Sequence, residues 1–136
     1  MDIEALARRW AQTWTRSWPA KDVAAIASLY SSDAAYRALV FREPDLGVAG
    51  VQRYLTDNFA VEEDVECWFG EPIPAGNRAA VEWWATWVEN GQRLTLAGAT
   101  VLRFGDDGLV VDHRDYWNQV ETREPPFAGW FHPLPK

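Results

Sequence analysis

The apolar residues of this chain change their spacing near residue 60, and this change limits the folds open to it. Before that point they recur every three or four residues, which is typical of helices that pack by one face. Beyond it they form long strand-like runs, and Asn90-Gly91 separates two of these runs. Both residues tolerate a positive φ, so the pair predicts a tight hairpin between strands 78–89 and 92–104. Helices are therefore expected ahead of an antiparallel meander.

The first half of the chain predicts three helices and one short strand. Asp2 is the expected N-cap of the first helix, which Pro19 should end. Asp22 should cap a second, short helix, a strand should occupy residues 34–41, and a third helix should follow Gly47. The second half predicts four strands, at residues 64–73, 78–89, 92–104 and 109–120. The expected fold class is α+β, a curved and mostly antiparallel sheet wrapped around N-terminal helices, with a conical hollow between them.

The predicted elements divide the chain into one domain and a tail. Residues 1–124 are expected to form a single domain. Residues 125–136 are rich in proline and aromatic residues, so they are not expected to form regular structure. Phe127, Trp130 and Phe131 are too apolar to stay in solvent, so the tail is expected to pack on the domain or on a partner.

Charge and residue types exclude several classes of function. The chain has 20 acidic and 13 basic residues and a net charge of −7, which disfavours nucleic acid as a partner. One cysteine permits no internal disulfide and favours a cytoplasmic location. No signal peptide and no membrane-spanning run is apparent. Only two histidines are present and no zinc spacing, phosphate-binding loop or dinucleotide fingerprint occurs, so neither a metal nor a cofactor is expected.

Tryptophan is the unusual component of the composition. Nine Trp outnumber six Phe and four Tyr. Each indole can bury roughly 150–250 Å², and so many bulky rings are hard to close-pack around one centre in a small domain. Three interpretations stay open: an aromatic core, an aromatic-walled cavity or an aromatic dimer face.

Five segments, taken in order, carry a family resemblance. They are LYSSDAAY at 29–36, the helix at 47–59, residues 77–87, LRFGDDGLV at 102–110 and RDYWN at 114–118. This ordered set resembles the nuclear transport factor 2-like superfamily and, within it, the SnoaL-like proteins. The resemblance implies a cone-shaped α+β barrel, a pocket inside the cone and a homodimer formed through the outer face of the sheet.

Asp115 is the candidate general base. Strand alternation places His113, Asp115 and Trp117 on one face of the last strand. If that face borders an aromatic hollow, desolvation favours the use of Asp115 as a general base. The alternative is a solvated strand segment in which Asp115 pairs with a neighbour such as Arg114. The resemblance favours the first interpretation, since the corresponding aspartate is catalytic in limonene-type epoxide hydrolases and SnoaL-like cyclases.

Tyr36 and His113 are the other candidate catalytic residues. Tyr36 corresponds to the tyrosine that orients a water molecule in the epoxide hydrolases that this chain resembles. The alternative is a tyrosine that is buried in the core with its hydroxyl hydrogen-bonded. His113 could relay protons with Asp115, or it could be a packed, hydrogen-bonded histidine. The candidate ligand-binding residues are Trp14, Tyr30, Trp83 and Trp117.

The chain departs from the families that it resembles. Ala38 stands where the epoxide hydrolases have an asparagine, and residues 81–85 contain no Arg–Asp pair. Trp14 and Ala38 stand where ketosteroid isomerases place a tyrosine and a base aspartate. Neither of those active sites is complete in this chain.

Three functions follow from these residues. The first is a cofactor-free isomerase, cyclase or hydrolase that acts on a small apolar or aromatic molecule, with Asp115 as general base. The second is a non-catalytic binding module that uses the same pocket. The third is a dimerisation module in which an outward Trp84, with Thr86 and Arg103 near it, forms an aromatic patch with a polar rim.

Overall fold

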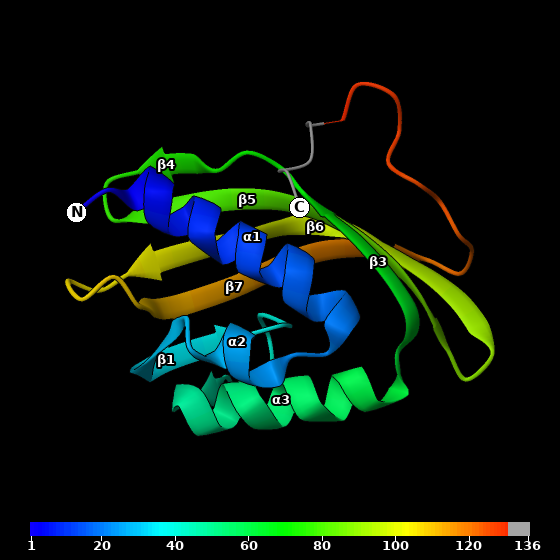
Figure 1. Ribbon diagram of the computed structural model, residues 1–136, viewed down its shortest axis with the longest axis horizontal. Helices are drawn as coiled ribbons and strands as arrows, with labels where there is room; N and C mark the ends of the chain where they lie inside the picture. The colour runs from blue at the N-terminus through cyan, green and yellow to red at the C-terminus, as the bar shows by residue number, and fades with distance from the viewer. Residues whose placement is uncertain (131–136) are drawn as a thin grey trace.

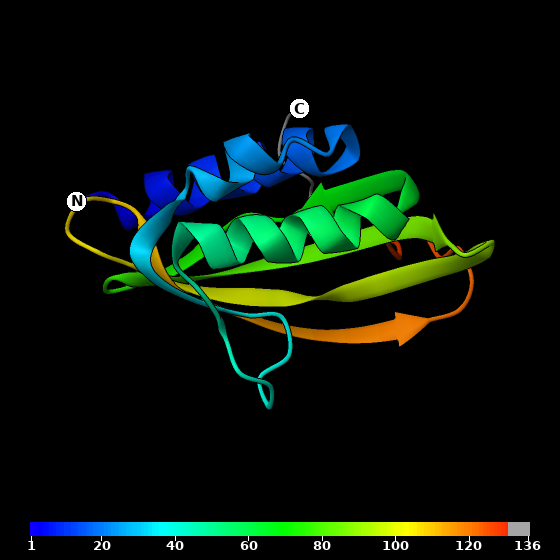
Figure 2. The ribbon, with the colours of Figure 1, turned by 90° about the horizontal axis from the view of Figure 1, so that it is seen from below.

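The computed structural model describes residues 1–130 of the chain, as three helices on one side of a curled sheet (Figures 1 and 2). The helices are α1 (Ile3–Ala20), α2 (Val23–Ala27) and α3 (Gly47–Val61). The strands are β1 (Tyr30–Arg37), β2 (Asp45–Leu46), β3 (Glu63–Phe69), β4 (Ile73–Ala75), β5 (Arg78–Glu89), β6 (Gln92–Phe104) and β7 (Val110–Val120). The predicted α+β class is confirmed.

The sheet is mixed and does not close into a barrel. Its strand order is β2-β1-β7-β6-β5-β3, with β4 paired to β5 outside this path. β1 and β7 run parallel, and all other pairs are antiparallel. The predicted hairpin is present, because Glu89 pairs with Gln92 across Asn90 and Gly91, whose φ values are 52° and 76°.

α1 presents its tryptophans to the sheet. The Asp2 side chain caps the helix by accepting a hydrogen bond from the backbone N–H of Ala5 at 3.0 Å. The prediction that Pro19 ends the helix is wrong, since α1 continues to Ala20. Proline has no N–H to offer the carbonyl of Thr15 four residues back, and the Cys67 thiol donates to that oxygen at 3.8 Å instead.

Two predicted strands also differ from the structure. β1 runs from Tyr30 to Arg37 rather than over residues 34–41, and its pairing with β7 includes Tyr30 opposite Val110. The polar residues 31–33, which suggested a break, fall where this parallel register shifts. The strand predicted at 64–73 is divided into β3 and β4, since Gly70 and Pro72 interrupt it.

Alternation along β5 decides which face is inside. Val81, Trp83, Ala85 and Trp87 are buried and belong to the hydrophobic core beneath the helices. Trp84 lies on the opposite, outer face of the sheet.

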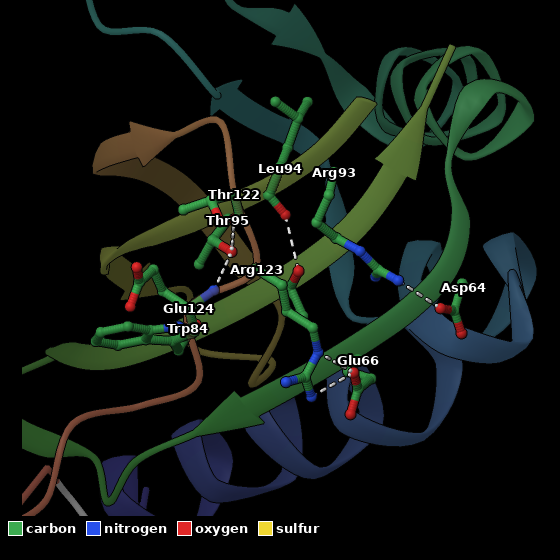
Figure 3. Close-up of polar contacts among 10 residues, drawn as sticks. Asp64, Glu66, Trp84, Arg93, Leu94, Thr95, Thr122, Arg123 and Glu124 are labelled. Carbon is green, nitrogen blue, oxygen red and sulfur yellow. Dashed lines mark hydrogen bonds and ion pairs between the residues drawn. The ribbon is translucent and has the colours of Figure 1, made fainter. Parts of the chain in front are cut away.

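The chain after β7 crosses this outer face (Figure 3). Thr95 on β6 donates to the carbonyl of Thr122 at 2.7 Å, and the Trp84 indole N–H donates to the carbonyl of Glu124 at 2.7 Å. Arg123 reaches Glu66 on β3 at 2.9 Å. Further along, the rings of Phe127 and Trp130 meet Trp84 edge-on, with centroids 5.8 and 6.0 Å away. Phe131 and the rest of the tail lie outside the described residues.

This arrangement changes the surroundings expected for Trp84. The ring contacts the chain's own Phe127 and Trp130. Thr86 is buried and donates to the carbonyl of Leu94 at 2.9 Å. Arg103 is not near Trp84, because it pairs with Arg78 at the far end of β5, roughly 20 Å along the strand. Arg103 therefore does not contribute to a rim around Trp84, and the polar residues that share the surface hollow beside it are Thr95, Asn118, Gln119 and Glu124.

Candidate functional site

A cavity of about 610 Å³ lies between the helices and the inner face of the sheet. Indole rings make up much of its wall, and α1, β5 and β7 supply them. The six tryptophans that line it are Trp10, Trp14, Trp18, Trp83, Trp87 and Trp117. Five of these rings also belong to the buried hydrophobic core, as the aromatic-core interpretation expected.

Trp18 is the central ring of this wall. Its ring centroid lies 5.5 Å from that of Trp14, 6.1 Å from that of Trp83 and 5.8 Å from that of Trp87. The indole N–H of Trp14 is buried and has no hydrogen-bond partner among residues 1–130.

The Asp115 carboxylate borders the cavity from the β7 side. Its side chain is 12% exposed. Oδ1 accepts from the Thr100 hydroxyl at 2.6 Å and lies 2.8 Å from Nε2 of His113. No hydrogen bond to Oδ2 is made by the residues that the structure describes. One carboxylate oxygen is therefore held in place while the other stays available to the cavity.

Two indole N–H groups fix the direction of the hydrogen bonds that reach Asp115. The Trp83 indole N–H donates to the Thr100 hydroxyl at 2.8 Å, and that hydroxyl in turn donates a hydrogen bond to Oδ1 of Asp115. On the other side, Trp10 donates to the Tyr30 hydroxyl at 3.0 Å, and that hydroxyl lies 2.8 Å from Nδ1 of His113.

This network assigns the tautomer of His113. The ionised Asp115 carboxylate can only accept, so Nε2 of His113 carries a proton and donates a hydrogen bond to Oδ1. Nδ1 of the neutral ring is then an acceptor, and the Tyr30 hydroxyl donates to it while accepting from Trp10. In this arrangement the Trp10 and Trp83 indoles, the Tyr30 and Thr100 hydroxyls and both nitrogens of His113 have partners, and both arms of the network end on the same carboxylate oxygen.

Tyr36 packs flat against His113. The ring centroids are 3.8 Å apart and the interplanar angle is 18°. Burial, with a further contribution from the charge of Asp115, raises the pKa of Tyr36 well above its ordinary value. The phenol therefore stays protonated, and a hydroxyl in this state can donate a hydrogen bond to a ligand oxygen.

Glu62 is a cavity residue that the sequence did not reveal. It directly follows α3 and its side chain is buried. The Trp18 indole N–H donates to Oε1 at 2.8 Å. Burial raises the pKa of Glu62 to about 7, against the opposing effect of the Trp18 hydrogen bond. In the sequence Glu62 is the first of three consecutive acidic residues, a pattern that is typical of a solvent-exposed turn.

The structure brings together six of the seven predicted site residues on the cavity wall. These are Trp14, Tyr36, Trp83, His113, Asp115 and Trp117. Tyr30 does not line the cavity, because it lies behind His113 and holds that ring by its hydroxyl. Thr100 was missed, although its place among the inward-facing Leu96, Gly98 and Leu102 of β6 was a usable signal.

Two searches of the described residues were negative. Within residues 1–130, no group of three or more His, Cys, Asp or Glu side chains is placed to hold a metal ion. In the same part of the chain, no helix combines the length and the apolar character needed to cross a membrane.

Comparison with known proteins supports the fold described above. The profile of the SnoaL-like domain family matches residues 7–113. A search of curated proteins finds no match.

Several solved structures have the same fold. Their sequence identities to this chain are 17–20%, so the similarity extends to the fold alone. SalBIII, described as an epoxide hydrolase/cyclase-like enzyme with a role in pyran ring formation in the polyether salinomycin, superposes with a TM-score of 0.74 at 20% identity, over 86% of this chain and 93% of its own. RV0760c from Mycobacterium tuberculosis gives 0.72 at 17% identity, over 88% and 98%. A hypothetical protein with a ketosteroid isomerase-like fold from Catenulispora acidiphila, in complex with trimethylamine, gives 0.70 at 18% identity, over 79% and 83%.

Proposed function

Because this chain belongs to the SnoaL-like family, we propose that its cavity binds a small apolar or aromatic molecule on which Asp115 acts as general base. The reaction is a cofactor-free isomerisation, cyclisation or hydrolysis. The observation that carries the proposal is the Asp115 carboxylate on an indole-lined wall, with one oxygen held and the other unbonded.

The cavity supports the first part of the proposal. Its volume of about 610 Å³ falls within the range of roughly 300–1,000 Å³ that is common for small-molecule pockets. The wall combines ten Trp, Tyr and Phe side chains with eleven polar or charged ones, which suits a ligand whose apolar or aromatic body is oriented by hydrogen bonds. The neighbour that holds trimethylamine supports small-molecule binding by this fold.

The neighbouring groups support a proton-transfer role. A carboxylate can take a proton through its free oxygen while the other oxygen keeps the group aligned. Tyr36 remains a phenol and can donate to an oxygen that gains charge, as an oxyanion-stabilising group does. SalBIII, as an epoxide hydrolase/cyclase-like enzyme, adds support for hydrolysis or cyclisation.

Turnover of candidate substrates tests the proposal. The purified chain is screened against ketone, polyketide-like and epoxide compounds, and any activity is repeated with Asp115→Asn. Asp112→Asn is the matched control, because it makes the same change on the same strand, where Asp112 pairs with Arg114 at 2.7 Å on the opposite face. An activity that Asp115→Asn leaves unchanged removes the proposed role of this carboxylate.

A non-catalytic binding module is the second candidate. The missing Arg–Asp pair at residues 81–85 and Ala38 in place of a polar residue favour it. Quenching of tryptophan fluorescence by apolar ligands, without turnover of any of them, would support this alternative. A failure to bind any of these compounds would count against both candidates.

The assembly and location are also proposals. A homodimer through the outer sheet face would cover Tyr116, which is 47% exposed there. Sedimentation at micromolar concentration tests it, and a monomer would exclude a dimerisation module. We place the protein in the cytoplasm because a single cysteine permits no internal disulfide.

A further inference from the structure

The wall of the cavity around Glu62 carries a buried acid without a basic partner. Glu62 is 5% exposed, and its one hydrogen bond comes from the neutral Trp18 indole. No Lys, Arg or His nitrogen of the described residues lies within ion-pair distance of it. A buried carboxyl group is neutralised either by a proton or by a positive partner, so a cation that enters the cavity can take the place of the proton on Glu62.

The rings beside Glu62 are well suited to a cation. Trp18 meets Trp87 at 5.8 Å with an interplanar angle of 48°, and all three side chains line the cavity. The face of an indole carries partial negative charge and attracts a cation placed above it. A carboxylate and two tilted indoles therefore form one wall with two independent attractions for positive charge.

Acidic residues outnumber basic ones around the cavity. Its wall includes five acidic residues and two arginines. Both arginines, Arg42 and Arg53, are exposed, whereas Glu62 is buried and Asp115 is 12% exposed. Solvent screens exposed charges more than buried ones, so the Asp115 carboxylate, and that of Glu62 when it is ionised, outweigh the arginines inside the cavity.

We propose that the Glu62 wall of the cavity recognises an ammonium-bearing group of the ligand, held between the Glu62 carboxylate and the indole faces of Trp18 and Trp87. This proposal rests on the proposed binding function and narrows its ligand to molecules that combine an apolar body with a cationic group. The Asp115 side of the cavity is left for the reacting part of the molecule.

Binding of a permanent cation should then depend on pH. Burial raises the pKa of Glu62 to about 7, so much of it is neutral in the empty cavity near pH 7. The groups that act on it are Trp18 and Lys21 at the end of α1, Glu89 on β5 and Tyr54 on α3. A cation favours the ionised carboxylate, so affinity should rise from pH 6 to pH 8 and then level off.

Choline and its neutral carbon isostere 3,3-dimethylbutan-1-ol test the proposal directly. They share size and shape, and choline keeps its charge at every pH. Binding to the full chain is followed by tryptophan fluorescence and NMR shifts at constant ionic strength, up to concentrations on the order of tens of millimolar. Choline should bind about tenfold or more tightly than the isostere at pH 8.

Substitutions distinguish the effect of the Glu62 charge on binding from an effect on the fold. Glu62→Gln keeps an acceptor for Trp18 and should remove both the preference for choline and its pH dependence, whereas the exposed neighbour Glu63→Gln should keep them. Trp87→Leu should weaken choline more than the isostere. Thermal melting confirms that each variant is folded. The proposal is overturned if the two probes bind equally, if choline does not bind, or if Glu62→Gln keeps the preference for choline. Binding of the neutral isostere under any of these outcomes would still support an apolar binding pocket.

Discussion

His113 joins Tyr30 to Asp115, with Nδ1 2.8 Å from the tyrosine hydroxyl and Nε2 2.8 Å from the carboxylate. The ring is thus held at both nitrogens, and Tyr36 stacks on its face. A histidine restrained in this way cannot turn away from the carboxylate without breaking two buried hydrogen bonds. We therefore expect His113 to act mainly by positioning the Asp115 carboxylate.

Tyr30→Phe should destabilise the fold without changing the cavity wall. The change removes the hydroxyl that accepts from Trp10 and donates to His113, so two buried groups lose their partner. The expected loss is about 1–3 kcal/mol in the free energy of unfolding, measured by urea denaturation. Tyr116→Phe is the control, since that residue is 47% exposed and should shift stability by less than about 0.5 kcal/mol. Equal effects of the two changes would contradict the network.

His113→Phe should lower turnover more than substrate binding. The variant keeps an aromatic ring beside Tyr36, but the Nε2–H bond to Asp115 is lost. Asp115 then keeps only the hydrogen bond from Thr100 and is less well aligned for proton transfer. With a substrate in hand, kcat should fall by roughly tenfold or more while KM changes little. An unchanged kcat in the folded variant would contradict the positioning role of His113.

Glu62 should make stability fall as pH rises. Its pKa is raised by burial from 4.5 to about 7 in the folded chain, so between these values the unfolded chain ionises and the folded chain does not. The folded state then binds more protons, and its advantage is complete below pH 4.5 and lost as pH passes 7. The total is on the order of 3 kcal/mol.

Comparison of two glutamine variants measures this effect. Unfolding free energies of wild type, Glu62→Gln and Glu63→Gln are determined from pH 4.5 to pH 8. Wild type and Glu63→Gln should lose stability relative to Glu62→Gln over that interval. Three parallel curves would show that Glu62 ionises normally in the folded chain.

Gly98→Ala should disrupt the β6–β7 pairing beside the site. A Cβ at this position would lie 2.0 Å from the carbonyl oxygen of Tyr116 and 2.7 Å from the Cα of Trp117. Backbone atoms cannot move aside locally, so the strands must separate, at a cost of about 1–3 kcal/mol or more. Gly105→Ala is the milder control, because its closest contact is the Val111 side chain at 3.2 Å. Thermal melting should rank the two accordingly.

Local periodicity predicted the parts of the site that lie on one strand. Alternation along residues 109–120 placed His113, Asp115 and Trp117 together, and the Asn90-Gly91 pair fixed the register of β5 against β6. These features depend on neighbours in sequence, and the family resemblance supplied the curled α+β arrangement around them.

Contacts between distant segments could not be predicted in the same way. Tyr30 and His113 are 83 residues apart, and Trp18 and Glu62 are 44 apart. The parallel pairing of β1 with β7 brings the first pair together, and the packing of α1 against the start of β3 brings the second. Pro19 was misjudged for a related reason, since the thiol that satisfies the freed carbonyl of Thr15 comes from Cys67 on β3.

The most direct test of the account is the activity of Asp115→Asn on a substrate that the wild-type chain converts. The account predicts that kcat falls by roughly 10²–10⁴-fold, while the substrate still binds and Asp112→Asn keeps nearly full activity. An Asp115→Asn variant that turns over substrate at the wild-type rate would contradict it.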